Sequence, residues 1–309
     1  MKKPNYVAIF IKPGCDNDFS YTKKAIDILS QYHIKTYLPS HWQADFQAEA
    51  DHLVEFLPDE TAMTQSADMM LVLGGDGTMI GYSGRAAELG KPTAGVNLGT
   101  LGFLTALERT EMDGLSALGT GDFTTEDRML LDVEIEDEKG DVIHRQRILN
   151  DVIITSGMRS KIAEFSLFSQ NGKILDYRSD GLIVATPTGS TAYSFSAGGP
   201  VIDPTAEIIS VTPLCPHTLL RGSVLLAPTT EITVFGKTRD LAMTDIHITM
   251  DGKNSRLISK DAKIHIKKSE YIARIVKIGT NRFYDILETK LNTKEESASY
   301  EKYTSFSNP

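Results

Sequence analysis

Residues 69–78 read Met69-Met70-Leu71-Val72-Leu73-Gly74-Gly75-Asp76-Gly77-Thr78. The apolar run is typical of a buried strand in a parallel sheet. The residues after it, 77–89, predict a helix that ends at Gly90. Glycines let the backbone turn sharply and approach a ligand closely, and the N–H groups at a helix start can bind phosphate oxygens. The stretch therefore predicts a strand, a phosphate-binding turn and a helix.

Asp76 is the unusual member of this turn. Its carboxylate would repel a phosphate, so it needs another task, either holding a metal ion or taking a proton from a hydroxyl. Phosphoryl transfer to an alcohol requires that combination of phosphate cradle and carboxylate. The plainer interpretation is an aspartate that caps the following helix.

Strands and helices alternate in the first part of the chain. Besides 69–73, strand-like apolar runs lie at 6–11, 35–38 and 92–96, and Tyr21, Ala25, Ile28 and Tyr32 have helical spacing. Residues 41–60 are acidic and predict no clear element. This alternation indicates a parallel α/β sheet, and we expect an N-terminal α/β domain over residues 1–118.

The pattern then changes to one typical of β-structure. Residues 131–136 alternate apolar and acidic side chains, and Gln170-Asn171-Gly172 between two apolar runs is a strong hairpin signal. Asp251-Gly252 predicts another turn. We therefore expect a β-rich C-terminal domain over residues 119–280.

The end of the chain changes character again. Phe283, Ile286, Leu287 and Leu291 have helical spacing and predict a last helix at about 281–291, which we group with the N-terminal domain. The remaining residues, 292–309, predict a polar tail.

Composition excludes several classes of protein. A chain of 309 residues suggests about two domains. Its net charge of −9 argues against nonspecific binding to nucleic acid, which requires a basic surface. Two cysteines make a disulfide framework implausible and indicate a reducing compartment, and no apolar stretch is long enough to span a bilayer. We expect a cytoplasmic protein without a membrane partner.

A second region rich in small polar residues covers 179–200 and includes Thr186-Pro187-Thr188-Gly189-Ser190-Thr191-Ala192-Tyr193-Ser194. Hydroxyl and glycine residues suit close contact with phosphate, ribose and base edges, and Tyr193 could stack on a base. The alternative is a Ser/Thr-rich turn that satisfies its own backbone, with Tyr193 in the core.

Two shorter stretches allow a functional and a structural interpretation. Asn150-Asp151 could read an amino-substituted base together with ribose hydroxyls, although such a pair is more often a turn or helix cap. Cys215 and His217 are too few for a metal site, so we interpret residues 212–219 as a rigid loop. Apart from the open alternative for Asp76, we assign no metal ligand of the protein's own.

Common nucleotide fingerprints are absent. Ile80 stands where the dinucleotide-binding pattern requires its third glycine. Gly189-Ser190-Thr191 lacks the lysine of a P-loop. Phosphate must therefore be bound in another way.

Five stretches together resemble the NAD kinase family. They are residues 74–78, 97–104, 150–151, 179–200 and 212–219, and their order and spacing extend over most of residues 5–290. The Gly-Gly-Asp-Gly motif alone is shared with lipid and sugar kinases such as diacylglycerol kinases and phosphofructokinases. Together with the segment 186–194 it is specific.

The resemblance implies an N-terminal α/β domain and a C-terminal β-sandwich-like domain with the ligand between them. It implies transfer of the ATP γ-phosphate to the 2′-hydroxyl of the adenosine ribose of NAD, with Mg²⁺ or another divalent ion bridging the ATP phosphates. Asp76 would accept the hydroxyl proton or bind the metal. Relatives are usually homodimers or homotetramers.

The resemblance also implies which residues contact the nucleotides. The turn would cradle phosphates, Asn150 and Asp151 would hold polar edges, and Asp180 with residues 191–196 would line the adenosine or nicotinamide pocket. The full set is Gly74, Gly75, Gly77, Thr78, Asn97, Asn150, Asp151, Lys161, Arg178, Asp180, Thr191, Ala192, Tyr193, Ser194, Ser196 and Lys253.

The chain departs from the family pattern at three places, one of which is the acidic tail beyond Asn292, for which the family has no matching feature. The family commonly has Asn-Glu where this chain has Asn150-Asp151, which shortens the reach of the carboxylate by ~1.5 Å. Residues 220–223 read Leu-Arg-Gly-Ser, where the family often has Ser-Asn/Arg-Arg-Pro.

Two other classes of function remain open: another small-molecule or lipid kinase, and a silent NAD-binding regulator.

Overall fold

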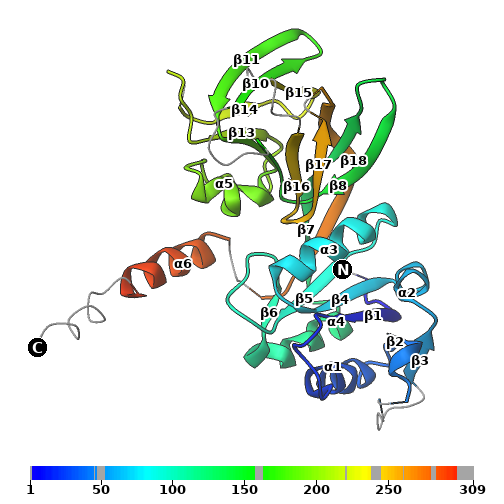
Figure 1. Cartoon of the computed structure of the whole chain (residues 1–309). Coiled ribbons are helices and arrows are strands. Elements are labelled where there is room, and N and C mark those ends of the chain that lie inside the picture. The colour runs from blue at the N-terminus through cyan, green and yellow to red at the C-terminus, as the bar shows by residue number, and fades with distance from the viewer. Residues whose placement is uncertain are drawn as a thin grey trace, which may run out of the picture. The chain divides into compact units, whose positions relative to one another are not determined.

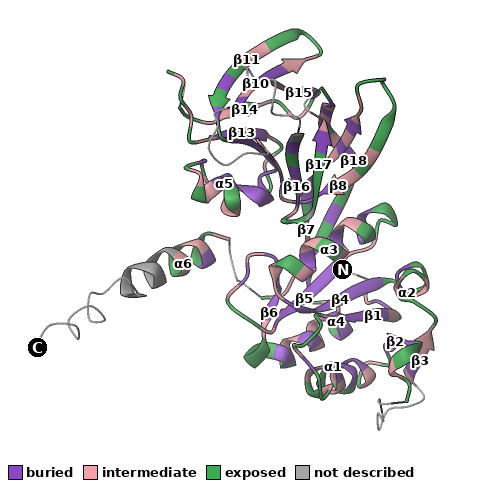
Figure 2. Ribbon diagram, in the orientation of Figure 1, coloured by how far each residue is buried: buried purple, intermediate pink, exposed green. Residues whose placement is uncertain are grey.

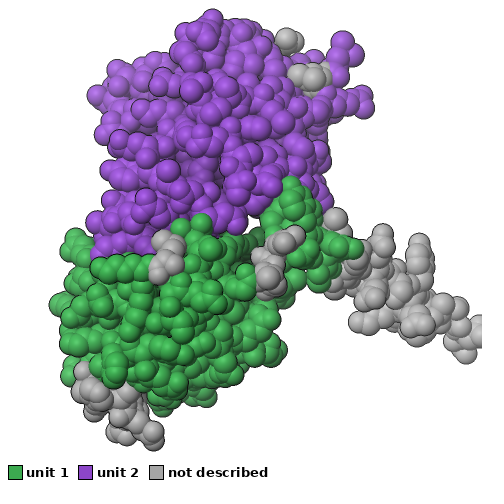
Figure 3. All heavy atoms as spheres, turned by 180° about the vertical axis from the view of Figure 1, so that it is seen from behind, with its two compact units in different colours: residues 1–79, 94–125, 276–309 green, residues 80–93, 126–275 purple. Residues whose placement is uncertain are grey.

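The computed structural model describes residues 2–44, 46, 53–156, 163–219, 221–237, 245–259, 261–279 and 283–297. The chain folds into two compact units, which Figure 3 shows in different colours. Unit 1 contains residues 1–79, 94–125 and 276–309, and unit 2 contains residues 80–93 and 126–275. The domain boundary that the sequence suggests at residue 118 stays a prediction.

Unit 1 is an α/β unit built on a parallel sheet (Figure 1). Its elements are β1 (Tyr6–Ile11), α1 (Ser20–Ser30), β2 (Lys35–Pro39), η1 (Ser40–Trp42), β3 (Val54–Leu57), α2 (Glu60–Ser66), β4 (Met69–Gly74), the start of α3 (Asp76–Glu88), β5 (Thr93–Asn97), β6 (Leu107–Glu108), η3 (Arg109–Leu115), α4 (Ser116–Thr120) and α6 (Phe283–Ser297). The strand order is β5-β4-β1-β2-β3, and β6 pairs in parallel with β5. This confirms the predicted parallel sheet.

The centre of that sheet is apolar. Every residue of β4 is buried, as Figure 2 shows in purple, which explains its unbroken apolar sequence. Val7, Ile26 and Leu71 belong to one core cluster of unit 1, and so does Val276 from far along the chain. Strand β3 lies within residues 41–60, where the sequence predicted no clear element, and helix α2 begins at the end of that stretch.

Unit 2 is built from antiparallel strands. They are β7 (Thr124–Glu136), β8 (Val142–Ile148), β9 (Asp151–Ser156), β10 (Ala163–Ser169), β11 (Gly172–Ser179), β12 (Gly181–Ala185), β13 (Ile209–Leu214), β14 (Val224–Leu226), β15 (Ile232–Lys237), β16 (Asp245–Met250), β17 (Lys253–Ser259) and β18 (Lys263–Lys277), with the short helices η4 (Thr188–Thr191) and α5 (Tyr193–Ser196). One sheet has the order β14-β13-β12-β9-β16-β17. In the other, the order β11-β10-β15-β18 is extended by β7 and β8.

The two sheets of unit 2 share one core. Ile154 and Val184 of the first sheet and Phe165 and Ile264 of the second belong to the same buried cluster, so the unit is sandwich-like. The hairpin predicted at residues 170–172 is confirmed, and its Gly172 has a φ of 114°, which favours glycine.

Helix α6 ends at Ser297, beyond the predicted end at residue 291. Among the described residues, none of the helices is long and apolar enough to cross a membrane.

Candidate functional site

Asp76 lies at the start of α3, directly after the turn that follows β4. Its two carboxylate oxygens accept hydrogen bonds from the backbone N–H groups of Phe103, at 2.8 Å, and Leu104, at 3.0 Å. A Cβ atom at Gly102 would overlap Asp76 Oδ1, so only glycine leaves room for the carboxylate there. An aspartate that only caps a helix does not need hydrogen bonds from a loop distant in sequence. The two hydrogen bonds from Phe103 and Leu104 instead fix the orientation of the Asp76 carboxylate.

Asn97 ends β5 and shapes the loop that holds Asp76. It is buried, its Nδ2 donates to the Thr100 carbonyl at 2.6 Å and to Glu108 Oε2 at 2.9 Å, and its Oδ1 accepts from the Gly99 N–H at 3.0 Å. The structure thus gives Asn97 a role in loop geometry as well as a place beside the pocket described next.

The turn and the loop line a pocket of about 290 Å³ within unit 1. Its lining residues are Lys12, Cys15, Gly74, Gly75, Asp76, Gly77, Asn97, Gly99, Thr100, Leu101 and Lys290. We call it the Asp76 pocket. It brings together the predicted Gly74, Gly75, Asp76, Gly77 and Asn97; the predicted Thr78 lies one residue further along α3.

Sequence reasoning missed the two lysines of this pocket. Lys12 directly follows β1, and the carboxyl ends of parallel strands are where ligands bind in such sheets, so this signal was available. Lys290 lies in α6, more than two hundred residues from the turn in sequence, and nothing local indicated it.

A second group of predicted residues lies in unit 2, around Asn150 and Asp151. The Asp251 carboxylate accepts the backbone N–H groups of Leu149 at 2.9 Å, Asn150 at 2.7 Å and Asp151 at 3.3 Å. Asn150 Oδ1 is buried and has no hydrogen-bond partner among the described residues, so it can accept a donor from a ligand. Asp251 was predicted only as a turn residue, so its role here is a finding of the structure.

A buried carboxyl group, that of Asp151, therefore lies close to the half-buried carboxylate of Asp251. Asp151 is 3% exposed, and burial together with the neighbouring charge of Asp251 raises its pKa to about 7. Burial also raises the pKa of Asp251, while the three backbone N–H groups oppose that rise. The Asp151 carboxyl group therefore gains or loses its proton near pH 7.

The turn 186–191 is attached to Asn150 by close backbone contacts. The Thr186 N–H donates to the Asn150 carbonyl at 2.9 Å, and Thr186 Oγ1 donates to the Leu149 carbonyl at 2.5 Å. A Cβ atom at Gly189 would overlap the Asn150 backbone, so this position requires glycine. The functional segment 186–196 and the pair 150–151 thus form one local structure.

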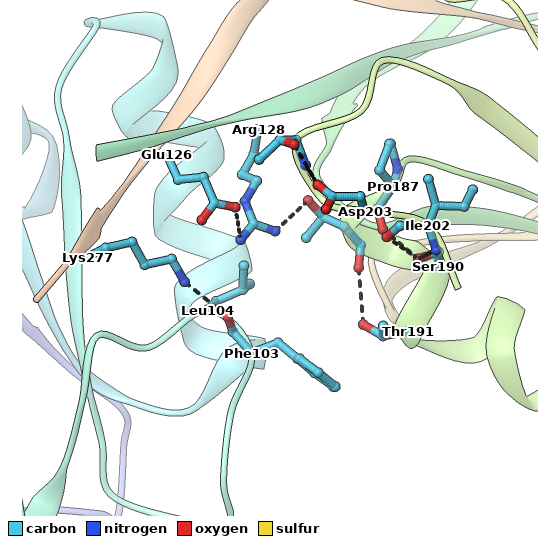
Figure 4. A network of polar contacts seen from close by, with 12 residues as sticks. Phe103, Leu104, Glu126, Arg128, Pro187, Ser190, Thr191, Ile202, Asp203 and Lys277 are labelled. Carbon is cyan, nitrogen blue, oxygen red and sulfur yellow. Dashed lines mark hydrogen bonds and ion pairs between the residues drawn. The ribbon is translucent and has the colours of Figure 1, made fainter. Parts of the chain in front are cut away.

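Hydroxyl groups of this segment are partly used within the protein (Figure 4). Ser190 Oγ donates to the Pro187 carbonyl at 2.7 Å and accepts the Ile202 N–H at 3.0 Å. Ser194 Oγ pairs with Thr212 Oγ1 at 3.1 Å in a buried position. The interpretation as a turn that satisfies its own backbone describes Ser190, whereas the predicted contact residue Ser194 pairs with a hydroxyl group of β13.

Other side chains of the segment stay accessible. Tyr193 is 47% exposed, which contradicts its alternative interpretation as a core aromatic. Ser196 is exposed, and Thr191 and Ala192 are half-buried. These residues can meet a ligand without rearrangement.

Arg128 was missed by sequence reasoning although it supports this segment. It is 2% exposed; its Nη2 lies 2.6 Å from Glu126 Oε1 and its Nη1 lies 3.4 Å from Thr188 Oγ1 (Figure 4). A buried arginine of this kind positions the turn and is costly to replace.

The remaining predicted residues are more scattered. Arg178 and Asp180 are exposed at the end of β11, and Lys253 is exposed at the start of β17, where its Nζ lies 3.6 Å from the place of a Cβ on Gly81. Lys161 lies outside the described residues.

This fold and this glycine-rich turn with an oriented carboxylate are those of a two-domain phosphotransferase. The model of the ATP-NAD kinase N-terminal domain matches residues 20–117, and that of the ATP-NAD kinase C-terminal domain matches residues 149–278. The chain therefore belongs to the NAD kinase family.

Individual relatives agree with this assignment. The chain is 34% identical over 280 residues to an NAD kinase of Thermoanaerobacter sp. (strain X514), covering 90% of this chain and 96% of the relative. It is 39% identical over 229 residues to an NAD kinase of Carboxydothermus hydrogenoformans, covering 74% and 80%. Neither supports the alternatives of another kinase or a silent regulator.

Two solved structures share the fold. One is yeast NADH kinase complexed with NADH, with a TM-score of 0.82 and 20% identity over 97% of this chain and 90% of that chain. The other is an NAD kinase from Archaeoglobus fulgidus in complex with ATP, with a TM-score of 0.65 and 22% identity over 93% and 99%. They confirm the predicted combination of an α/β domain and a β-sheet domain.

Proposed function

We propose that the protein is an NAD kinase, which transfers the γ-phosphate of ATP to the 2′-hydroxyl of the adenosine ribose of NAD and so forms NADP. The observation that carries this proposal is the Asp76 carboxylate, held by two backbone N–H groups in a pocket walled by glycines and two lysines. Family membership supplies the identity of the substrates.

Asp76 accepts the proton of the 2′-hydroxyl as its oxygen attacks the γ-phosphorus. The new O–P bond forms while the bond between the β–γ bridging oxygen and the γ-phosphorus breaks, and ADP leaves with that bond's electron pair. The Phe103 and Leu104 N–H groups fix the direction of the carboxylate, which matters because a general base must reach its proton at hydrogen-bond distance.

Mg²⁺ fits this site as a companion of the phosphates. Among the described residues, no group of three or more His, Cys, Asp or Glu side chains lies together as a metal cage. Mg²⁺ is usually held by substrate phosphates with one or two carboxylates; the phosphates would hold it here, and Asp76 would contact it only in its alternative role as a metal ligand instead of the base. When bound, the ion neutralises charge on the transferred phosphoryl group.

Residues of unit 2 bind the dinucleotide in this proposal. Asn150 offers a buried acceptor, and Tyr193 offers an exposed ring for stacking. Asp151 has a pKa of about 7, so near neutral pH its carboxyl group can either donate or accept a hydrogen bond. The roles of Thr191, Ala192, Ser196, Arg178, Asp180, Lys161 and Lys253 as further contacts rest on the family resemblance.

The setting of the enzyme is part of the proposal. We propose that it works in the cytoplasm as a homodimer or homotetramer. Cys15 and Cys215, which are both free, support a reducing compartment, and the family resemblance supports the oligomer.

The direct test is formation of NADP from NAD, ATP and Mg²⁺ by the purified protein and by Asp76→Asn. The amide has nearly the same size but cannot accept the proton, and its NH2 group cannot accept one of the two backbone N–H groups, so we expect a decrease in kcat of about 10²- to 10⁴-fold. Asp27→Asn changes an exposed carboxylate of α1 and serves as the control, with an expected rate within about twofold of wild type. Wild-type protein that makes no NADP, or an Asp76→Asn protein as active as wild type, would refute the proposal.

A further inference from the structure

The Asp76 pocket is locally basic in an acidic protein. Its described lining contains two lysines, Lys12 and Lys290, and one carboxylate, Asp76, although the whole chain has a net charge of −9. Backbone N–H groups at the start of α3 add further partial positive charge. The pocket therefore favours a polyanion, and the question is which residues beyond the glycine-rich turn bind it.

Helix α6 presents one face to the loop that holds Asp76. Phe283 packs on Phe103 with ring centroids 5.5 Å apart, and Ile286 on the same helix is buried. Lys290 follows Phe283 by seven residues, which is two helical turns and returns to the same face. The helix is thus docked by its aromatic and aliphatic residues in a way that brings Lys290 to the pocket.

The ammonium group of Lys290 has a defined position at this loop. Its Nζ lies 4.1 Å from the centroid of the Phe103 ring, within the range of a cation–π interaction. Phe103 is also the residue whose N–H donates to the Asp76 carboxylate at 2.8 Å. One loop residue therefore contacts both the base and the lysine.

We propose that Lys290 is a phosphate-binding residue of this enzyme, which contacts the triphosphate of the phosphoryl donor through its ammonium group. The inference rests on the proposed function for the identity of the donor as ATP. The positive charge of Lys290 would also attract the diphosphate of NAD, so the experiment must distinguish binding of ATP from binding of NAD. We commit to the triphosphate because the pocket is built on the turn that cradles the transferred phosphoryl group.

The kinetic test uses Lys290→Met, Lys290→Arg and the control Lys139→Met, which removes a charge from the exposed turn between β7 and β8. Removing one charge-assisted hydrogen bond to a phosphate predicts about a tenfold or larger rise in KM for ATP. KM for NAD should change by less than about twofold, Lys290→Arg should keep most of the ATP affinity, and Lys139→Met should match wild type. An unchanged KM for ATP, or a rise in KM for NAD alone, would overturn the proposal.

A binding test does not depend on turnover, because Cys15 lines the same pocket. With Cys215→Ser as background, Cys15 is the single thiol of the chain, and its rate of labelling by a maleimide reports occupancy of the pocket. Inorganic tripolyphosphate should slow labelling in this background. After Lys290→Met, an approximately tenfold higher tripolyphosphate concentration should be needed for the same protection of Cys15. NAD serves as the comparison ligand.

The two tests separate this inference from the proposed function. If no variant forms NADP but Lys290→Met still weakens protection by tripolyphosphate, the proposed function fails and the lysine assignment stands. If tripolyphosphate does not protect Cys15, or protects it equally well after Lys290→Met, the lysine assignment fails whatever the enzyme makes. Hydrogen exchange of α6 amides confirms that the helix remains docked in the variant.

Discussion

The buried Asp151 and the half-buried Asp251 are neighbours in unit 2, and their different surroundings act differently on their two pKa values. Asp251 accepts three backbone N–H groups, which favour its ionised form. Asp151 has burial and the charge of Asp251 acting on it, and both raise its pKa, to about 7. The folded protein therefore binds a proton at Asp151 over a pH range in which the unfolded chain does not.

This difference predicts a pH-dependent effect of Asp151→Asn on stability. Below about pH 4 the carboxyl group is protonated in both states, and the free energy of unfolding does not depend on it. As pH rises from about 4 to about 7, only the unfolded state loses the proton, so wild type becomes less stable. With 1.36 kcal/mol per pKa unit, the decrease is on the order of 4 kcal/mol.

Thermal unfolding at pH 5 and pH 8 measures this effect. Asp151→Asn, which cannot ionise, should gain several degrees in Tm relative to wild type at pH 8 and much less at pH 5. Glu138→Gln removes an exposed carboxylate from the turn after β7 and should show no such trend. A Tm difference that is the same at both pH values would show that the carboxyl group is not protonated as we infer.

At the scale of elements, helix η4 depends on one glycine. A Cβ at Gly189 would overlap the Asn150 backbone, and backbone cannot move aside as a flexible side chain can. Gly189→Ala should therefore displace the turn and destabilise the protein by about 1–3 kcal/mol. Because the turn adjoins Asn150, we also expect weaker binding of NAD, measured by calorimetry beside urea unfolding.

Gly222→Ala is the matched control for this change. Apart from its two chain neighbours, no described residue has an atom within 4 Å of the place where its Cβ would be added, and its φ is not positive. It should therefore unfold and bind NAD as wild type does, within about 0.5 kcal/mol. Equal behaviour of the two alanine variants would mean that η4 does not need its close approach to Asn150.

The elements also show what sequence can and cannot predict about the fold. Strand β4 was predictable because its first five residues are apolar and all six of its residues are buried. Strand β3 was missed because it is a four-residue edge strand with one buried side chain. Helix α2 has only Met63 and Thr64 buried, so its hydrophobic periodicity is weak even though Asp59 caps it by accepting the Ala62 N–H.

The residues of the site also divide into those with a local sequence signal and those without one. Asp76 and Asn97 were predictable because their local pattern, polar residues after buried strands, carries the signal. Asp251, Arg128 and Lys290 were not, because each takes its role from interactions with residues distant in sequence. Only the tertiary structure brings such residues to a site.

At the scale of the whole molecule, unit 1 is assembled from three separate stretches of chain. Its last stretch contributes Val276, which is fully buried in the core cluster that contains Val7 and Leu71, and Ile278, which packs against that cluster. Helix α6 follows these two residues and contributes no member to the cluster among its described residues. The fold of unit 1 should therefore depend on a few residues after Ile275 more than on the helix.

Two shortened chains test this dependence. A chain that ends at Gly279 keeps Val276 and Ile278, and the amides of β1 and β4 should keep most of their protection from hydrogen exchange. A chain that ends at Ile275 also lacks these two side chains, and burial of Val276 alone stabilises by roughly 1.5–3 kcal/mol. Removing those four further residues should therefore reduce protection in β1 and β4 more than removing the thirty residues after Gly279 does. The amides of β9 and β12 in unit 2 serve as the internal reference. If the chain ending at Gly279 has already lost protection as fully as the shorter one, α6 rather than the end of β18 completes the fold of unit 1.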